Sequence, residues 1–326
     1  MRKKRVILGT VISALTLCAT AVPAGAVTYV PLPENTITTE NETSVTNYGA
    51  AGYMVTEYDI SKKSVSEISY KDSILETSPD VETTPPFDVE DTSATALVKP
   101  ESEVSTYAVV GTDNRVRVTN TTANPFKKIA YMEMIWPDGY AARATGFMVG
   151  NSSVATAGHA VYNKDHGGFA SSIIVWPGKN EGKTPYGSAT ATKITIPKVY
   201  FTDQDARYDA AVFKINKALG KKTGYFGLRR QNEAFTNEVY VTGYPGNRAG
   251  QMWKMKDVPR VTTKYRLTYN IDTTAGQSGS PIYRIYNGKW YAIGIHTTGH
   301  LKNGSGYKNS GVIFHSTIYK MLKRYN

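Results

Sequence analysis

From about Ala108 to its end, the chain consists of short apolar runs separated by turns that contain glycine or proline. The clearest runs are residues 129–136, 153–156, 173–176, 210–215, 238–242 and 290–295. Regular short strands of this kind are typical of antiparallel β-barrels and sandwiches. We therefore expect an all-β domain, followed by one short helix over residues 316–324, where apolar positions have helical spacing behind a serine or threonine cap.

Residues 1–26 have the pattern of a secretory signal peptide. A basic start at residues 2–5 precedes an apolar stretch, and Ala24-Gly25-Ala26 supplies the small residues of a cleavage site. A membrane anchor is the weaker interpretation, because the apolar stretch is shorter than the roughly 20 residues that span a bilayer. Cys18, the only cysteine, lies in this segment, so we expect the exported protein to contain no disulfide.

Residues 27–107 form an acidic segment ahead of a basic domain. They hold 15 acidic against 4 basic side chains (net −11), whereas residues 108–326 hold 12 against 30 (net +18). This segment has few apolar runs, and the sequence TTPP at residues 83–86 would interrupt a helix or strand. We therefore predict a pro-segment that is largely extended or disordered. Its charge favours docking on the basic domain, and an acidic solubilising linker is the alternative. The basic residues are scattered and form no nucleic-acid motif, so we expect no nucleic-acid partner.

A serine framed by glycines, in Gly276-Gln277-Ser278-Gly279-Ser280-Pro281, is the candidate nucleophile. Glycines let the chain bend sharply and leave N–H groups free to face a substrate. We expect the N–H groups of Gly276 and Ser278 to form an oxyanion hole. A serine hydroxyl is a weak nucleophile by itself, so the chain must also supply a base and an orienting acid.

His159 is the candidate base, because it follows the strand-like run 153–157 and can project from its end. His166 is its rival, but it lies in a polar loop with no strand to fix it. Asp209 is the candidate acid, because it directly precedes the apolar run 210–215. We expect Asp209 to fix the tautomer of His159 and to stabilise the imidazolium that forms during reaction.

Asp203 and Asp205 compete with Asp209, but their polar loop favours solvated carboxylates. An α/β-hydrolase is disfavoured, because Ser280 stands where the nucleophile elbow of that fold needs glycine. In α/β-hydrolases the catalytic residues also follow one another as serine, acid and histidine, whereas the candidates here have the order histidine, acid, serine. The pair His296 and His300 suggests zinc, but it lacks the glutamate of the metalloprotease motif and is not helical in pattern. We therefore expect no metal and no cofactor.

Taken together, these motifs resemble those of the glutamyl endopeptidases, the V8-like branch of the trypsin-like serine proteases of Gram-positive bacteria. The matching segments are residues 109–115, 156–159, 208–209, 243–246 and 276–281. The resemblance implies two six-stranded antiparallel β-barrels of the chymotrypsin type. Residues 108–225 would form the first, with His159 and Asp209, and residues 226–326 the second, with Ser278, the specificity pocket and the C-terminal helix.

The resemblance also implies a preference for Glu before the cut and leaves open whether Asp is accepted as well. In the family, a histidine on the strand after the nucleophile and a threonine five residues before the serine bind the substrate carboxylate; here these are His296 and Thr273. Both side chains can donate hydrogen bonds to a carboxylate. Two departures stand out: Ala144 and Ala160 replace the disulfide of Bacillus relatives, and Gln277 replaces the aspartate of trypsin's activation switch.

We therefore expect a secreted, monomeric serine endopeptidase, made as a proenzyme and acting on polypeptides with acidic residues, without stable membrane insertion after removal of the signal peptide. Its own pro-segment would be its partner before activation. Self-cleavage at Glu103-Val104 with trimming predicts a mature start between Val104 and Val109. Two alternatives stay open: a protease of the same fold with another preference, and a non-catalytic module that binds surfaces through its basic face.

Overall fold

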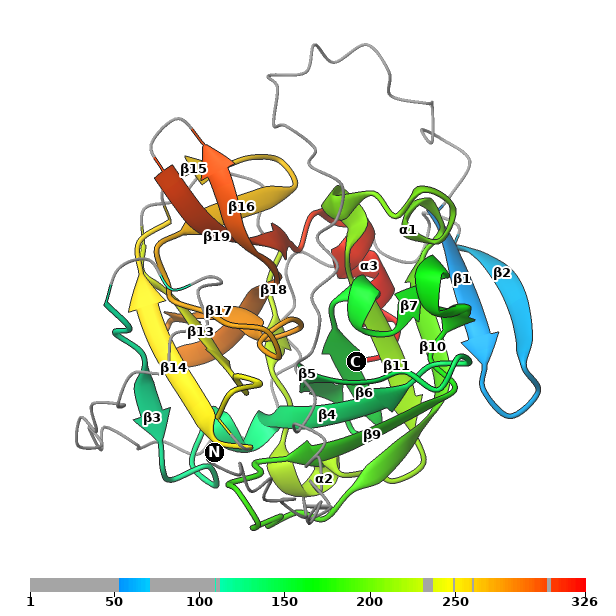
Figure 1. Cartoon of the computed structure of the whole chain (residues 1–326), viewed down its shortest axis with the longest axis horizontal. Coiled ribbons are helices and arrows are strands. Elements are labelled where there is room, and N and C mark those ends of the chain that lie inside the picture. Colours follow the sequence, from blue (N-terminus) through cyan, green and yellow to red (C-terminus); the bar gives the residue numbers. More distant parts are fainter. Residues whose placement is uncertain are drawn as a thin grey trace, which may run out of the picture.

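The computed structural model describes residues 53–70, 109, 112–230, 237–248, 250–259, 261–303 and 306–326. The signal peptide expected at residues 1–26 and the cut expected between residues 103 and 109 lie outside this part of the chain. Figure 1 shows two β-rich halves side by side, with the helix α3 (Ser316–Lys323) between them and a hairpin at the outer edge of the first half. The all-β fold class is confirmed.

Six strands form the first half. They are β4 (Ile129–Ile135), β5 (Ala141–Gly150), β6 (Ser153–Thr156), β9 (Ser172–Pro177), β10 (Ala189–Pro197) and β11 (Ala211–Ile215). Their order is β11-β6-β5-β4-β9-β10, and β10 also pairs with β11, which closes the sheet. All of these pairings are antiparallel. The predicted six-stranded barrel is therefore confirmed.

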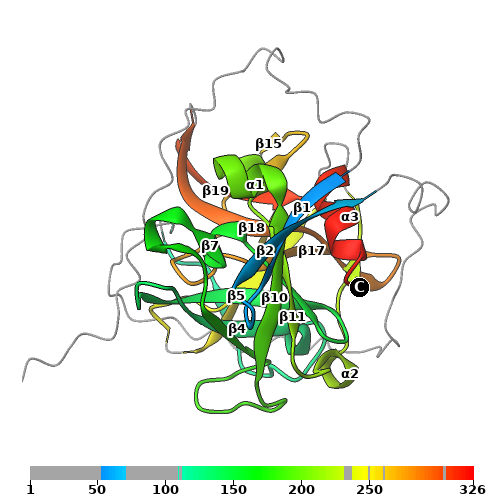
Figure 2. The same ribbon diagram turned by 90° about the vertical axis from the view of Figure 1, so that its right-hand side faces the viewer.

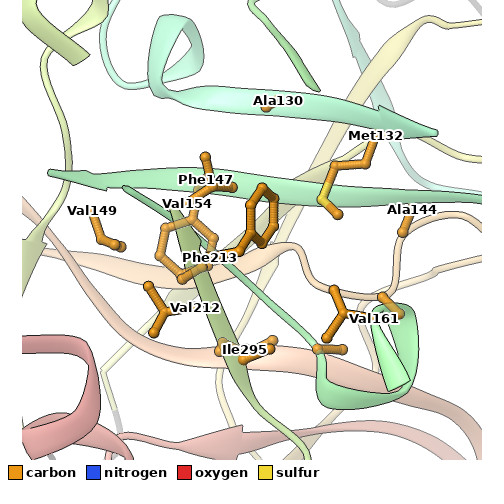
Figure 3. Packing of buried hydrophobic residues seen from close by; sticks show 14 of the residues in the cluster. Ala130, Met132, Ala144, Phe147, Val149, Val154, Val161, Val212, Phe213 and Ile295 are labelled. Carbon is orange, nitrogen blue, oxygen red and sulfur yellow. The ribbon is translucent and has the colours of Figure 1, made fainter. Parts of the chain in front are cut away.

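Alternation of side chains across each strand fills this barrel. In β9, Ile173 and Val175 are buried while their neighbours are partly exposed, as a period of two requires. Phe147, Val154 and Phe213 meet in the interior, and Ile295 from the second half joins the same cluster (Figure 3). The two halves therefore share apolar contacts and are joined by more than the connecting chain.

The second half is an antiparallel sheet with the order β15-β16-β19-β18-β17-β13-β14-β3 and a short parallel strand, β12, beside β18. Its strands are β3 (Val116–Val118), β12 (Gly227–Leu228), β13 (Val239–Gly243), β14 (Met252–Asp257), β15 (Val261–Thr262), β16 (Arg266–Tyr269), β17 (Pro281–Tyr286), β18 (Lys289–Asn303) and β19 (Gly306–Ile313). This sheet is consistent with the second barrel, although it holds nine strands where six were expected.

The first and last elements of the domain do not keep to the expected division into halves. β3 follows the predicted pro-segment boundary, yet it pairs with β14 of the second sheet. The predicted C-terminal helix is confirmed as α3, and its buried Ile318, Met321 and Leu322 belong to the apolar cluster that residues of both halves share. The expected serine or threonine cap is wrong: His315 is the N-cap residue and makes no side-chain capping bond.

Short elements connect the strands. They are the 3₁₀ turns η2 (Phe126–Lys128), η3 (Gly158–Ala160), η4 (Lys164–His166) and η5 (Ala206–Tyr208), the strands β7 (Tyr162–Asn163) and β8 (Gly168–Phe169), and the helices α1 (Lys198–Asp203) and α2 (Gly220–Thr223). Among the described helices, none has both the length and the apolar character needed to cross a bilayer.

Part of the predicted acidic pro-segment is ordered. β1 (Tyr53–Asp59) and β2 (Ser64–Tyr70) form an antiparallel hairpin, and β1 pairs with β10 of the first barrel. Residues 53–70 are therefore extended strands in a paired hairpin, and the alternative of disorder is wrong for them. The two runs contain several β-branched and aromatic residues, a strand signal that the acidic composition of the segment as a whole obscures.

Candidate active site

His159 and Asp209 meet because of the register between β6 and β11. Thr156 at the end of β6 pairs with Ala211 at the start of β11, so residues just beyond these positions face each other. The Nδ1 atom of His159 lies 2.8 Å from Oδ2 of Asp209, and the backbone N–H of His159 donates to Oδ1 at 2.9 Å. One carboxylate thus holds both the ring and the backbone of the histidine.

Burial and charge act in opposite directions on this pair. Burial raises the pKa of the Asp209 carboxyl, but the charge of His159 and hydrogen bonds from it outweigh burial and bring the pKa below its usual value. Burial lowers the pKa of His159, but the Asp209 carboxylate outweighs that effect and raises the pKa above 6.5. An ionised Asp209 beside a more basic imidazole follows.

The competing candidates lie elsewhere. Nδ1 of His166 lies 2.7 Å from Oδ2 of Asp138, and its ring stacks on Tyr140. Asp205 pairs with its near neighbour Arg207, at 2.6 Å, and Asp203 is exposed at the end of α1. The structure brings neither His166 nor these two aspartates to the His159–Asp209 pair.

The turn that carries Ser278 is compact and rests on the first barrel. Gln277 N–H donates to the carbonyl of Thr274, and Ser280 N–H donates to that of Gln277. Gly279 has a φ of +85°, and a Cβ there would lie 2.0 Å from the carbonyl oxygen of Thr145, so both the turn and the contact require glycine.

Thr145 of β5 fastens this turn to the histidine's strand. Its N–H donates to the carbonyl of Ser278 at 2.9 Å, and its hydroxyl donates to the carbonyl of Gly276 at 2.9 Å. The hydroxyl of Thr156, three residues before His159, donates to the carbonyl of Thr145 at 2.8 Å. Ser278 and His159 are therefore held to the same two strands.

The backbone N–H groups of Gly276 and Ser278 donate to no backbone carbonyl within the part of the chain that the structure describes. The carbonyl oxygens around them are engaged: that of Ala275 accepts from Gly246 N–H at 2.6 Å, and that of Gly276 from Thr145. The turn is thus fixed by its carbonyls while two of its N–H groups remain available to a ligand.

His296 on β18 borders the same turn. Its backbone N–H donates to the carbonyl of Ser280 at 2.9 Å, and its carbonyl accepts from Gly279 N–H at 2.8 Å. Burial, with the nearby positive charges of His159 and Arg266, lowers the pKa of His296 to about 3, and a hydrogen bond with the Ser310 backbone opposes this shift. The imidazole of His296 is therefore neutral near pH 7.

Tyr269 contacts one ring nitrogen of His296. Its hydroxyl oxygen lies 2.7 Å from Nδ1 of His296, and both side chains are buried. Burial raises the pKa of Tyr269 far above its usual value, so the phenol keeps its proton and can donate a hydrogen bond to Nδ1. With the phenol as donor, the proton of the neutral ring lies on Nε2.

Thr273 is buried, and its hydroxyl finds no hydrogen-bond partner among the described residues. An unsatisfied hydroxyl in a folded interior is rare and often marks a place where a ligand or water binds. The structure thus brings Thr273 into the loop that ends at Ser278, with a free donor and no partner from the described chain.

Two arginines that the sequence analysis did not single out hold this region together. Arg266 donates from Nη1 to the carbonyl of Ala206 at 2.6 Å and from Nη2 to the hydroxyls of Thr297 and Thr298 at 3.0 and 3.1 Å. It therefore ties the loop that leads to Asp209 to the strand of His296. No local motif marks such a residue, because its partners come from distant segments.

Arg115 links the segment after the predicted mature start to the Ser278 turn. Its Nη1 donates to Oε1 of Gln277 at 2.6 Å and to the hydroxyl of Thr274 at 3.0 Å, and its side chain pairs with Asp113 at 2.7 Å. Gln277 replaces the aspartate of trypsin's switch, as expected, but its amide still receives a contact from the N-terminal segment.

The remaining predictions concern metal and disulfide. No group of three or more His, Cys, Asp or Glu side chains suited to a metal occurs among the described residues. The side chain of His300, half of the alternative zinc pair, lies outside them. Ala144 and Ala160 are both buried in the apolar cluster that contains the interior of the first barrel.

Comparison with known proteins agrees with this architecture. The model of the trypsin-like peptidase domain matches residues 144–295. A Bacillus subtilis protein named extracellular metalloprotease is 34% identical over 69% of this chain and 73% of its own length. Glutamyl endopeptidase of Bacillus licheniformis is 33% identical over 67% of this chain and 69% of its own length.

A solved structure of a Glu endopeptidase in complex with MPD is similar with a TM-score of 0.59, at 26% identity over 67% of this chain and 98% of that chain. The residues that match the family model, 144–295, include His159, Asp209 and Ser278. This chain therefore belongs to the glutamyl endopeptidase branch of the trypsin-like serine peptidases, and it is a serine endopeptidase.

Proposed function

We propose that Ser278 attacks the scissile carbonyl, that His159 takes its proton, and that Asp209 holds the imidazole in the productive tautomer. The observation that carries this proposal is the contact of His159 with the buried carboxylate of Asp209, with 2.8 Å between Nδ1 and Oδ2. An ionised Asp209 keeps a proton on Nδ1 and leaves Nε2 of His159 as the base. The imidazolium that forms returns its proton to the leaving amine.

The N–H groups of Gly276 and Ser278 receive the oxyanion of the tetrahedral intermediate. Support comes from the turn itself, in which the carbonyls are bonded while these two N–H groups are not engaged by the described backbone. Such donors act most strongly where the protein has already fixed them in place. Thr145 supplies that rigidity through its two bonds to the turn.

Covalent labelling tests the nucleophile. A fluorophosphonate probe should modify one serine in the processed protein, and peptide mapping should locate it at Ser278. Ser278→Ala should abolish both labelling and proteolysis, whereas the exposed Ser171→Ala should leave both intact. Labelling at another serine, or proteolysis by Ser278→Ala, would contradict the assignment; a folded, processed protein without labelling would favour the non-catalytic binding module.

We propose that the enzyme prefers Glu before the cut, with Asp second. The substrate carboxylate would accept hydrogen bonds from the unpartnered hydroxyl of Thr273 and from Nε2 of His296. The names of the relatives support the same preference. Because a site built to donate hydrogen bonds discriminates strongly against ligands that lack the acceptor, specificity for an acidic side chain follows.

Exchange of the pocket histidine tests this preference. His296→Gln should sharply reduce cleavage after Glu while leaving the slower cleavage after Leu or Ala near its original rate. Equal losses for all peptides would mean that His296 supports the fold or the triad. Unchanged Glu cleavage would favour the alternative of a same-fold protease with another specificity.

We further propose that the enzyme is secreted and made as a proenzyme that acts as a monomer on polypeptides. The sequence of residues 1–26 and the acidic residues 27–107 support this part of the proposal. N-terminal sequencing of the secreted protein should give a start between Val104 and Val109. A start before Pro85 would contradict the assigned boundary.

A further inference from the structure

The barrel strand β10 has an edge that its barrel neighbours do not fully cover. β9 pairs only with Ala189 and Thr190 of β10. Farther along, Lys193, Ile194 and Thr195 pair with β11 on one side and with β1 on the other. Since a strand has only two edges, β1 occupies the edge that β9 leaves open from Lys193 to Pro197. An open strand edge is a template for pairing with another extended segment.

The hairpin fills this edge with a continuous ladder. Five residues of β1, from Val55 opposite Pro197 to Asp59 opposite Lys193, are in register with β10, and Ile60 N–H donates to the carbonyl of Thr192 at 3.0 Å. Val55 and Thr56 are fully buried. In Figure 2, β1 and β2 lie beside β10 with α1 and α3 at either side of β1. The hairpin is therefore part of the packed structure.

Charge complementarity fixes the same contact. Lys193 of β10 donates to Glu57 at 2.8 Å, and Lys198 of α1 pairs with Glu67 of β2. The hydroxyl of Tyr325, near the C-terminal end, donates to the other oxygen of Glu57 at 3.0 Å. The side chain of Glu57 is only 14% exposed, so its bonds are partly shielded from solvent.

An aromatic contact extends from the hairpin toward the active site. The ring of Tyr58 stacks on Phe169 of β8, with centroids 4.7 Å apart and planes 5° apart. Phe169 in turn packs against Tyr162 of β7, again at 4.7 Å, only three residues after His159. The hairpin thus covers the outer side of the loop that follows the proposed base.

We propose that the edge of β10 from Lys193 to Pro197, with Phe169 and Tyr325, is a strand-docking surface, and that the hairpin of residues 53–70 is its occupant. The hairpin stays on this surface after the chain is cut between it and the protease domain. An isolated two-stranded hairpin is only marginally stable in water, so the pairing with β10 is what keeps this hairpin folded. The processed protease then carries a bound acidic fragment.

A controlled cut in the whole chain tests this proposal without depending on the protein's own catalysis. The chain would carry Ser278→Ala and a recognition sequence for an unrelated protease inserted after Pro86. After complete cleavage, native mass spectrometry and size-exclusion chromatography would show whether the N-terminal fragment stays with the domain. We expect a one-to-one complex at micromolar protein concentration.

Variants of the hairpin identify the contact. Thr56→Pro removes a ladder N–H at a buried position and should release the fragment at least about ten-fold more readily. Tyr58→Ala, which keeps the ladder, should weaken the complex less. Ser66→Ala, on the exposed face of β2, is the matched control and should bind like the parent. Circular dichroism would verify that the domain stays folded in each case.

Two results would overturn the proposal. Separation of the unaltered fragment from a folded domain at micromolar concentration would mean that the hairpin docks only while the chain is continuous. Retention of the Thr56→Pro and Tyr58→Ala fragments as firmly as the parent would mean that the fragment is held elsewhere. Because every arm uses the Ser278→Ala chain, neither result bears on the proposed catalytic mechanism.

Discussion

The two histidines of the site, the partly exposed His159 in the first half and the buried His296 in the second, have opposite chemistry because their partners differ. His159 faces the Asp209 carboxylate, which raises its pKa above 6.5 despite burial. His296 faces the Tyr269 phenol, which carries no charge, and burial lowers its pKa to about 3. The same side chain therefore suits proton transfer in one half and neutral hydrogen-bond donation in the other.

The halves also differ in how completely their polar groups are satisfied. Both oxygens of Asp209 accept hydrogen bonds from His159, so the pair is complete without substrate. The hydroxyl of Thr273 has no partner in the described chain. The polar pair of the first half is thus complete within the protein, whereas the second half contains a buried hydroxyl without a partner among the described residues.

The largest effect should follow from changing the acid of the first half. Asp209→Asn keeps the shape but favours the wrong tautomer of His159, so kcat should fall by about 10⁴-fold. Asp205→Asn is the matched control, because Asp205 pairs with Arg207 away from the site, and its kcat should stay near that of the parent. Steady-state kinetics on a peptide with Glu before the cut would compare kcat of the two variants with that of the parent. Similar losses in both variants would refute the assignment of Asp209.

A smaller and more selective effect should follow in the second half. Thr273→Val removes one donor to the substrate carboxylate at nearly constant volume, so kcat/KM for a Glu peptide should fall about 10- to 100-fold relative to a Gln peptide. The exposed Thr192→Val provides the control. An equal loss for the Glu and Gln peptides would mean that Thr273 shapes the turn without contacting the carboxylate.

Tyr269→Phe should have a milder effect. Loss of the phenol hydroxyl leaves Nδ1 of His296 without its donor and frees the ring to exchange tautomers. We expect kcat/KM for Glu to fall by about 5- to 10-fold, the range of one hydrogen bond of roughly 1 kcal/mol, with kcat for a Leu peptide unchanged. A loss of kcat for both peptides would instead point to a packing defect near Ser278.

The smallest effect concerns pH. His159 must be unprotonated to act as a base, and its pKa is raised. A plot of kcat/KM against pH should therefore show one ascending limb, with a midpoint above pH 6.5. His296, with a pKa of about 3, should add no second ascending limb to this pH profile near neutrality. Asp209→Asn should move the limb to lower pH, because the raising charge is removed. Thr273→Val should leave it in place, and a shift there would contradict the separation of the two roles.

Much of the fold and the site could be predicted because the information is local. Strand runs show alternation within a few residues, and His159, Asp209 and Ser278 each stand beside a recognisable strand or turn. The residues that sequence reasoning missed have distant partners: Arg115 and Gln277 are 162 positions apart, and Tyr269 and His296 are 27 apart. Nothing near Arg115 in the sequence indicates which turn it reaches.

The hairpin was missed for a different reason. Its two runs, YMVTEYD and SVSEISY, satisfy strand propensity, but the composition of residues 27–107 as a whole predicts disorder. The deciding factor is the uncovered edge of β10, which exists only after the barrel closes. A segment's order can thus depend on a surface made by residues more than 100 positions away, as with Glu57 and Lys193, 136 positions apart.

The most direct test of the account is a panel of peptides that differ only in the residue before the cut, assayed with processed enzyme and with Ser278→Ala. The account predicts fast cleavage after Glu, slower cleavage after Asp, little after Gln, and none by the variant. Cleavage without an acidic preference would contradict the Thr273–His296 pocket. Cleavage by Ser278→Ala would contradict the triad itself.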